Sequence, residues 1–190
     1  MKNMKVLVSD FFGVVVEEML PKFFENHVKD KEKAMEIKLS YSNPADIGEF
    51  TFEEELSRIA GDLGLPLEQV KEECYGYSKP IVRMVKLLRE CPFPVVLLSN
   101  APEGLVESLI EKYGLDDLFF YRIISYKERK KKPEQEIYKA VYRYFDEKSD
   151  FLFVDDNKAN LEAPNRLGWK TVQFKNDDPS FQAIEKWLNN

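Results

Sequence analysis

The chain has 190 residues, of which 28 are Lys or Arg and 34 are Asp or Glu, so its formal net charge is −6. With 44% hydrophobic and 33% charged residues, it has the composition of a soluble globular protein of one domain, or of one domain that carries a smaller insertion. The acidic balance argues against nucleic-acid and anionic-membrane partners, because both require a positive field.

The histidine and cysteine content excludes several kinds of catalytic site. The single histidine, His27, excludes three-histidine and HExxH zinc sites, and any Ser-His-Asp or Cys-His mechanism would have to use it. Cys74 and Cys91 form no CxxC pair and are interpreted as reduced thiols of a cytoplasmic protein. The remaining carboxylates, lysines and hydroxyls suit phosphate chemistry with a hard metal ion.

Five short apolar segments are predicted to be strands. The first four are nearly continuous apolar runs, which is the pattern of parallel strands covered on both faces. The N-terminal apolar run, residues 6–16, has Asp10 in its middle and is too short to cross a membrane. The segments are residues 4–9, 94–98, 121–124, 151–154 and 170–174.

Helical patterns separate these strands. Residues 102–113 and 133–145 each place apolar side chains on one stripe, and a shorter helix is predicted from about 158 to 167. Strands that alternate with helices predict an α/β fold with a doubly wound, parallel, Rossmann-like sheet.

The stretch between the first two strands contains helical patterns and no convincing strand. Thr51 and Glu54 form a capping box that opens one helix, and Pro66 begins another. Two further helical pieces are predicted upstream, with a break at Asn43-Pro44.

This helical stretch is far longer than an ordinary loop. We therefore expect residues 1–16 and 79–190 to form the core domain, and residues 17–78 to form a small helical cap domain inserted after the first strand. A helical layer packed permanently on the edge of the sheet is the alternative.

Polar side chains follow four of the predicted strands, directly after three of them and, for Lys132, after a short loop. Each on its own has an ordinary explanation as a turn former, a helix cap or a solvated charge. Together they are complementary, because carboxylates hold Mg²⁺, a hydroxyl and an amide hold phosphate oxygens, and a lysine neutralises phosphate charge. Ligands of open α/β sheets bind at this carboxyl edge. In strand order the residues are Asp10; Ser99 and Asn100; Lys132; and Asp155 and Asp156.

Four motifs in this order and spacing resemble the haloacid dehalogenase (HAD) superfamily of aspartate-nucleophile hydrolases. The resemblance covers essentially the whole chain, and the helical stretch resembles the small C1-type cap of that family. The matching segments are DFFGVVV at 10–16, LLSNAPEG at 97–104, KKPEQEIYKA at 131–140 and FVDDNKANLEAPNRLGWKTV at 153–172.

The resemblance implies a catalytic role for three residues. Asp10 would be the nucleophile that attacks phosphorus and becomes an aspartyl-phosphate. Ser99 would bind the transferring phosphoryl group, with Asn100 beside it. Lys132 would stabilise both Asp10 and the phosphoryl charge.

The resemblance also implies a magnesium site. Asp156 would bind Mg²⁺ together with Asp10 and the backbone carbonyl of Phe12. Asp155 would be a further carboxylate of the metal site, or one that supports it and faces Lys132. Asn160, which completes the DDxxxN pattern, would orient this group.

Phe12 departs from the family pattern. Typical phosphatases of the family have an Asp at this position as general acid and base, and a phenyl ring cannot protonate a leaving oxygen. General acid catalysis is typically worth about 10²–10⁴-fold. A substitute acid from the insertion is a possibility, with Glu17, Glu18 and His27 as candidates.

The leading interpretation is a Mg²⁺-dependent phosphatase that acts on a small phosphorylated metabolite with a good leaving group, such as an anomeric sugar phosphate or an acyl phosphate. One alternative is a catalytically silent phosphate-binding or interaction protein. Another is a 2-haloacid dehalogenase, a class with an aromatic residue at the position of Phe12 but without metal or the paired acids Asp155-Asp156. The sequence makes no prediction of substrate identity or oligomeric state.

Overall fold

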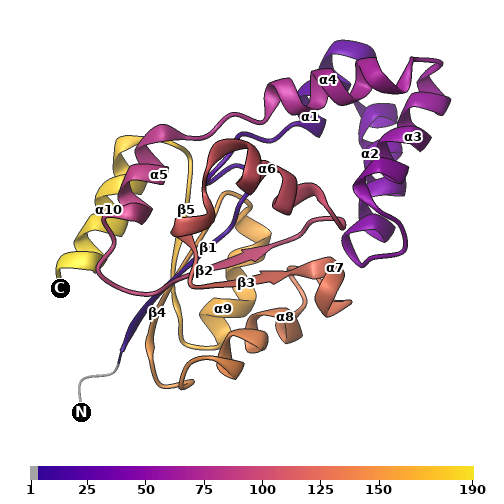
Figure 1. Cartoon of the computed structure of the whole chain (residues 1–190). Coiled ribbons are helices and arrows are strands. Elements are labelled where there is room, and N and C mark those ends of the chain that lie inside the picture. The colour runs from indigo at the N-terminus through magenta and orange to yellow at the C-terminus, as the bar shows by residue number, and fades with distance from the viewer. Residues whose placement is uncertain (1–3) are drawn as a thin grey trace.

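A computed structural model describes residues 4–190 and shows a five-stranded parallel sheet with helices on both faces (Figure 1). The strand order is β3-β2-β1-β4-β5, and every neighbouring pair is parallel. Each predicted strand matches an observed one to within one residue at either end, and the predicted doubly wound α/β fold is confirmed. The strands are β1 (Lys5–Ser9), β2 (Val95–Ser99), β3 (Tyr121–Ile124), β4 (Asp150–Asp155) and β5 (Lys170–Gln173).

Alternate strand residues fill two separate cores, one on each face of the sheet. In β1, Leu7 packs in the core that α5, α6 and α10 cover. Val6 and Val8 pack in the opposite core, beneath α8 and the segment that contains α9. Because both faces are covered, the strands are apolar along their whole length.

The helices of the sheet layer are shorter or less regular than predicted. The helix expected from residue 102 begins three residues later, after Gly104, whose left-handed φ of +89° ends the preceding loop. The predicted helices 133–145 and 158–167 each contain a 3₁₀ segment, at 140–143 and 158–161, and a C-terminal helix was not predicted. The α-helices are α5 (Val82–Arg89), α6 (Leu105–Tyr113), α7 (Ser125–Glu128), α8 (Gln135–Lys139), α9 (Glu162–Arg166) and α10 (Asp178–Asn189).

Four helices fill the stretch between β1 and β2, and we call them the helical insertion. The capping box at Thr51 and Glu54 is confirmed. The predicted break at Asn43-Pro44 is wrong, because the helix continues to Asp46 with Pro44 in its last turn. A proline this close to the end of a helix removes a single backbone hydrogen bond, so the last turn survives. The helices are α1 (Leu20–His27), α2 (Lys31–Asp46), α3 (Phe52–Leu63) and α4 (Leu67–Tyr77).

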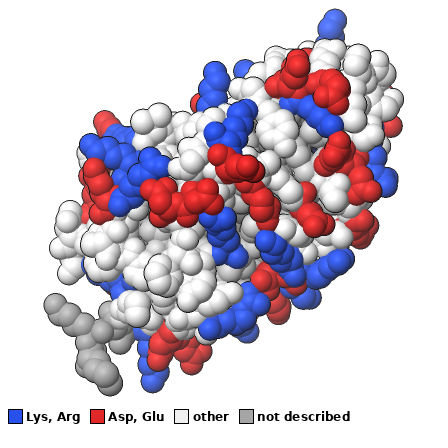
Figure 2. All heavy atoms as spheres, in the orientation of Figure 1, with Lys and Arg blue, Asp and Glu red and all other residues white. Residues whose placement is uncertain are grey.

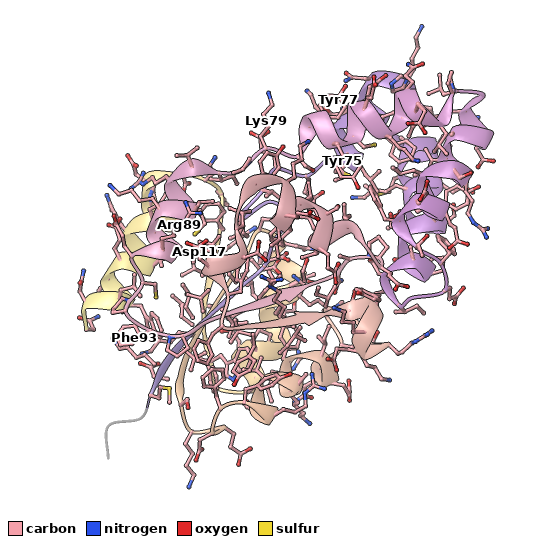
Figure 3. All side chains as sticks on the ribbon, in the orientation of Figure 1. Tyr75, Tyr77, Lys79, Arg89, Phe93 and Asp117 are labelled. Atoms are coloured by element: carbon pink, nitrogen blue, oxygen red, sulfur yellow. The ribbon has the colours of Figure 1, made fainter. Side chains whose placement is uncertain are left out.

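Two antiparallel segments connect the helical insertion to the sheet. The outgoing chain at Val15 to Glu17 pairs with the returning chain at Lys79 to Ile81: the amide of Glu17 donates to Lys79 at 2.8 Å, and the amide of Ile81 donates to Val15 at 2.8 Å. Figure 3 shows Lys79 on the returning segment, just after Tyr77 at the end of α4. The helical insertion is thus attached through one two-stranded neck.

Charged side chains of both signs are interspersed over the face of the molecule in Figure 2. Some form ion pairs, such as Arg89 of α5 with Asp117 at 2.9 Å, both labelled in Figure 3. This face therefore presents no large field of one sign. Within residues 4–190, no helix has both the length and the apolar composition to cross a membrane.

Candidate active site

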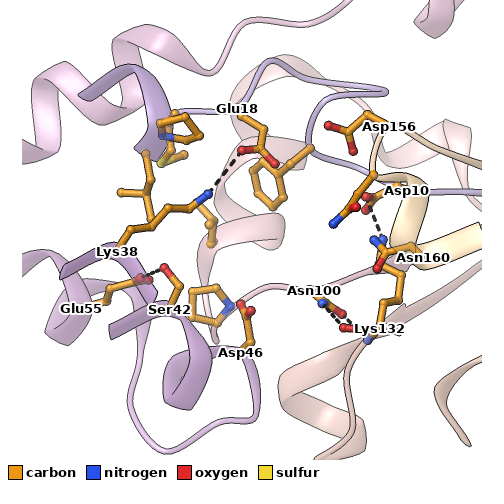
Figure 4. Close-up of a pocket in the computed structure, with 17 residues that line it drawn as sticks. Asp10, Glu18, Lys38, Ser42, Asp46, Glu55, Asn100, Lys132, Asp156 and Asn160 are labelled. Carbon is orange, nitrogen blue, oxygen red and sulfur yellow. Dashed lines mark hydrogen bonds and ion pairs between the residues drawn. The ribbon is translucent and has the colours of Figure 1, made fainter. Parts of the chain in front are cut away.

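The carboxyl edge of the sheet and the helical insertion enclose a cleft of about 180 Å³ (Figure 4). The sheet places two of its acids side by side, because Ser9 of β1 is in register with Val154 of β4 and the next residues are Asp10 and Asp155. The amide of Asp10 donates to the carbonyl of Val154 at 2.9 Å and holds the start of the loop against β4. The strand ends thus assemble the predicted acids at one point.

Lys132 lies between two carboxylates at the bottom of the cleft. Its Nζ is 2.7 Å from Oδ2 of Asp10 and 2.6 Å from Oδ2 of Asp155, and its side chain is 1% exposed. Two other lysines of the basic run have different partners: Lys127 pairs with Glu107, and Lys131 donates to Asn43 of the helical insertion. The structure therefore distinguishes Lys132 from an otherwise solvated run of charges.

Asp155 is held from several sides. Its Oδ1 accepts from the amide of Asn157 at 2.8 Å and from Nδ2 of Asn160 at 3.0 Å, while Oδ2 accepts from Lys132. Tyr138 donates in turn to the carbonyl of Asn160 at 2.7 Å. Because both oxygens already have partners, this buried carboxylate is suited to fixing the position of Lys132.

The side-chain amide of Asn100 holds the backbone of Lys132 in place. Its Oδ1 accepts from the backbone amide of Lys132 at 2.8 Å, and its Nδ2 donates to the carbonyl of the same residue at 3.0 Å. Ser99 is fully buried at the end of β2 and does not line the cleft; its hydroxyl has a single long contact of 3.5 Å, with the Asn100 carbonyl. Of the two predicted phosphate ligands, Asn100 therefore lines the cleft, with its side-chain amide bound to the backbone of Lys132, whereas Ser99 does not reach the cleft surface.

Three carboxylates gather within reach of one metal ion. One oxygen from each of Asp10, Asp155 and Asp156 lies within 4.8 Å of the others. With Lys132 the group has a formal charge of −3 + 1 = −2 when all four are ionised. Burial raises the pKa of Asp10 well above its usual value, against the lowering effect of Lys132. Burial, with help from Glu18 and Asp155, raises the pKa of Asp156 to about 6. A divalent cation would offset this charge, and hard oxygen donors suit Mg²⁺.

Gly13 makes room for the third carboxylate. A Cβ at this position would lie 2.5 Å from Oδ2 of Asp156, and the φ of Gly13 is +72°, where a side chain is strained. Its amide donates to the carbonyl of Val16 at 2.7 Å and closes the turn after Asp10. The loop therefore needs glycine to bring Asp156 close to Asp10.

Phe12 lines the cleft and offers no proton. Its ring packs edge-on against Phe11, with the centroids 5.2 Å apart. Of the three substitute acids considered from the sequence, only Glu18 lines this cleft, and it lies 3.6 Å from Lys38. His27 instead pairs with Glu73 at 2.6 Å within the helical insertion.

The opposite wall of the cleft contains polar residues that the sequence analysis missed. They come from α2 (Lys38, Ser42 and Asp46) and from α3 (Glu55). For Glu55 a signal was present: Phe52, Glu55 and Ile59 share the apolar stripe of α3, so an acid stands where a core residue is expected. For the three residues of α2 no such signal exists.

Glu55 should make stability depend on pH. It is 1% exposed, and burial raises its pKa to about 7, although Ser42 donates to Oε1 at 2.7 Å. The unfolded chain loses this proton near the usual value of 4.5, so the free energy of unfolding falls as the pH rises from there to about 7. Above pH 7 the free energy of unfolding is lower than at pH 4 by on the order of 3 kcal/mol from this group.

We therefore expect Glu55→Gln, which keeps an acceptor for Ser42, to raise the thermal midpoint at pH 8 and to change it little at pH 4. Denaturation followed by circular dichroism at both pH values tests this. The exposed Glu72 of α4 provides the control variant Glu72→Gln, which should have no effect at either pH. An equal effect of Glu55→Gln at both pH values would contradict the assignment.

Comparison with known proteins agrees with this geometry. The model of the haloacid dehalogenase-like hydrolase family matches residues 4–168. No curated protein matches the chain in sequence.

Solved structures share the fold over nearly the whole chain. A HAD family enzyme of Bacteroides thetaiotaomicron, solved in complex with magnesium and inorganic phosphate, is 24% identical with a TM-score of 0.75, and the match covers 94% of this chain and 98% of that one. A predicted HAD-like hydrolase of Porphyromonas gingivalis is 19% identical with a TM-score of 0.76, over 98% of both chains. The L-2-haloacid dehalogenase of Xanthobacter autotrophicus, with chloropropionic acid covalently bound, is 21% identical with a TM-score of 0.64, over 90% of this chain and 77% of that one.

Proposed function

The chain belongs to the haloacid dehalogenase-like hydrolases, and from this premise we propose that it is a Mg²⁺-dependent phosphatase that hydrolyses a small phosphorylated metabolite through an aspartyl-phosphate on Asp10. The observation that carries the proposal is the buried Lys132 between Asp10 and Asp155, with Asp156 as a third acid beside them. This arrangement orients a carboxylate nucleophile and leaves negative charge for a divalent cation to offset. The free thiols of Cys74 and Cys91 agree with a cytoplasmic setting.

The proposed reaction has two displacements. Asp10 is held for attack by the amide of Phe11, which donates to Oδ1 at 2.7 Å, and by Lys132 on Oδ2. A carboxylate oxygen of Asp10 bonds to phosphorus as the ester oxygen departs, and water then hydrolyses the acyl phosphate to free Asp10 and phosphate. Lys132 offsets the phosphoryl charge in both steps, and Asn100, which lines the cleft, is proposed to hold the phosphoryl group beside it.

Mg²⁺ would be held by Asp10, Asp156 and the backbone carbonyl of Phe12, with Asp155 supporting the site. When bound, it would supply positive charge that lets an anionic phosphate approach an anionic nucleophile. The magnesium and phosphate bound by the Bacteroides enzyme support the phosphatase over the dehalogenase, although dehalogenases share the fold.

A substrate screen tests the proposal. Purified protein is incubated with a panel of phosphorylated metabolites, p-nitrophenyl phosphate, acetyl phosphate and L-2-chloropropionate, each with and without Mg²⁺. Phosphate release that requires Mg²⁺ is expected. Metal-independent chloride release would indicate a dehalogenase, and no turnover of any compound would indicate the silent binder.

Removal of one acid should weaken magnesium binding. We expect Asp156→Ala to lower the affinity for Mg²⁺ by at least roughly tenfold, because the ion loses one charged oxygen ligand and alanine supplies no other. Isothermal titration with Mg²⁺ measures this. The exposed Asp178 of α10 provides the control Asp178→Ala. Unchanged affinity in Asp156→Ala would contradict the ligand assignment.

Residues 17–78 are proposed to act as a cap domain that opens and closes on the neck at Lys79. Polar contacts between residues 17–78 and the sheet domain support the closed position; among them, Lys131 Nζ donates to Asn43, Arg129 to the carbonyl of Gly48, and the amide of Phe52 to the carbonyl of Glu103. Closure would exclude water from the aspartyl-phosphate chemistry. Crystal structures with and without a phosphate analogue should show closed and open caps, and the same closed position in both would contradict gating.

A further inference from the structure

One buried hydroxyl group beneath the active site is not explained by packing. Tyr138 of α8 is completely buried in the core beneath α8 and the segment that contains α9. Its ring packs edge-on against Phe153, with the centroids 5.5 Å apart, and against Trp169, with the centroids 6.2 Å apart. A phenylalanine would make the same ring contacts. Because burial of a hydroxyl group costs free energy unless it forms a hydrogen bond, the oxygen of Tyr138 requires a separate explanation.

The partner of this hydroxyl is a backbone carbonyl that has no α-helical donor. Tyr138 donates to the carbonyl of Asn160 at 2.7 Å. In an α-helix, this carbonyl would accept from the amide four residues later, but residue 164 is a proline, which has no N–H. Asn160 and Pro164 are both buried, so water has little access to the carbonyl. Tyr138 therefore supplies the donor that Pro164 lacks.

Asn160 connects this hydrogen bond to the acids of the cleft. Its side-chain amide donates to both oxygens of Asp155, at 3.0 and 3.1 Å, and Asp155 accepts from Lys132 at 2.6 Å. Lys132 lies in turn 2.7 Å from Asp10. Figure 4 shows Asn160 beside Lys132 and Asp10. A continuous series of polar contacts, whose members are all less than 10% exposed, thus runs from Tyr138 to the candidate nucleophile.

We propose that Tyr138 is a positioning residue for the active site, because it holds the backbone at Asn160. The side chain of Asn160 then keeps Asp155 in the orientation that pairs with Lys132. The inference rests on the proposed function, in which Lys132 offsets the phosphoryl charge. Stabilisation of a transition state depends on groups that are already in place, so a small displacement of Lys132 should affect kcat more than KM.

Removal of the hydroxyl alone tests this role. Tyr138→Phe retains the ring and is expected to lower kcat for p-nitrophenyl phosphate by roughly tenfold, while KM changes less than about twofold. The matched control is Tyr142→Phe, because the hydroxyl of Tyr142 accepts from Trp169 Nε1 at 2.9 Å in the same core. This control should leave kcat within about twofold of the wild type, whatever its effect on the thermal midpoint. Equal losses of kcat in the two variants, or no loss in Tyr138→Phe, would overturn the positioning role.

A second substitution separates positioning from a loss of packing. Pro164→Ala introduces an amide that can donate to the carbonyl of Asn160 in place of the hydroxyl. The loss of kcat caused by Tyr138→Phe should therefore shrink from roughly tenfold to less than about threefold in the Pro164→Ala protein. All variants are compared below the melting temperature of the least stable one. An equal loss with and without Pro164→Ala would show that the carbonyl of Asn160 is not the link, and would overturn the inference.

An NMR measurement separates this inference from the proposed function. The ammonium protons of a buried, hydrogen-bonded lysine exchange slowly with water, so isotope-labelled protein should give a resonance for Lys132 that is absent from Lys132→Ala. We expect Tyr138→Phe to accelerate this exchange by at least roughly threefold, and Tyr142→Phe to leave it unchanged. That result without any hydrolysis by the wild type would retain the positioning role and reject the phosphatase. Hydrolysis by the wild type, with both exchange and kcat unchanged in Tyr138→Phe, would retain the phosphatase and reject the positioning role.

Discussion

Lys132→Ala is expected to lower kcat by roughly 10²–10³-fold, because the cation between Asp10 and Asp155 is lost. The same change leaves two carboxylates, both less than 10% exposed, without their partner. Breaking a buried ion pair typically costs about 3–5 kcal/mol, so the thermal midpoint should fall as well. Steady-state kinetics and thermal denaturation measure the two effects.

Lys130→Ala is the matched control. Lys130 belongs to the same basic run but is exposed, so its removal should change kcat less than about twofold. Kinetics are measured below the melting temperature of Lys132→Ala, so that unfolding does not contribute to the loss. Equal losses in the two variants would show that a diffuse basic patch, rather than a specific residue, neutralises the phosphate.

The second large effect concerns Phe12 and the leaving group. Without a general acid at this position, we expect p-nitrophenyl phosphate and acetyl phosphate to be hydrolysed about 10²–10⁴ times faster than a simple alkyl phosphate. Phosphoryl transfer to Asp10 is retained in all three reactions, and only proton delivery to the departing oxygen is lost. Comparison of kcat/KM across the aryl phosphate, the acyl phosphate and the alkyl phosphate measures the difference.

Phe12→Asp should narrow this gap by raising the rate for the alkyl ester. The control Phe12→Asn introduces a side chain of the same size as aspartate that is not an acid. The difference in rate between aryl and alkyl phosphates should therefore persist in this variant. Equal wild-type rates for alkyl and aryl esters, with chemistry limiting both, would show that another group supplies the proton. Glu18, Asp46 and Glu55 would then be the candidates, since these acids line the cleft.

The sheet and the residues at its carboxyl edge could be predicted from the sequence because both follow from local patterns. Strands covered on both faces are apolar throughout, so the segments around Leu7 and Leu97 were found to within one residue. The position of a polar residue directly after such a strand then places it at the carboxyl edge, as for Asp10.

The opposite wall of the cleft, formed by residues of α2 and α3, could not be predicted in the same way. Its residues meet the active site only through the packing of the helical insertion against the sheet domain, and Lys38 and Asp46 occupy unremarkable positions on their helix. The role of Asn100 was equally hidden, because its amide binds the backbone of Lys132, 32 residues away in the chain. Contacts of this kind depend on tertiary structure and leave no local pattern in the sequence.

The central claim is that Asp10 becomes phosphorylated, and trapping this intermediate tests it most directly. Protein is mixed with Mg²⁺ and acetyl phosphate, quenched in acid, digested and analysed by mass spectrometry. The account predicts a phosphoryl group on the peptide that contains Asp10, which is absent when Mg²⁺ is omitted and absent in Asp10→Asn. Hydrolysis that proceeds with no phosphorylated peptide under any quench time, or that survives in Asp10→Asn, would contradict it.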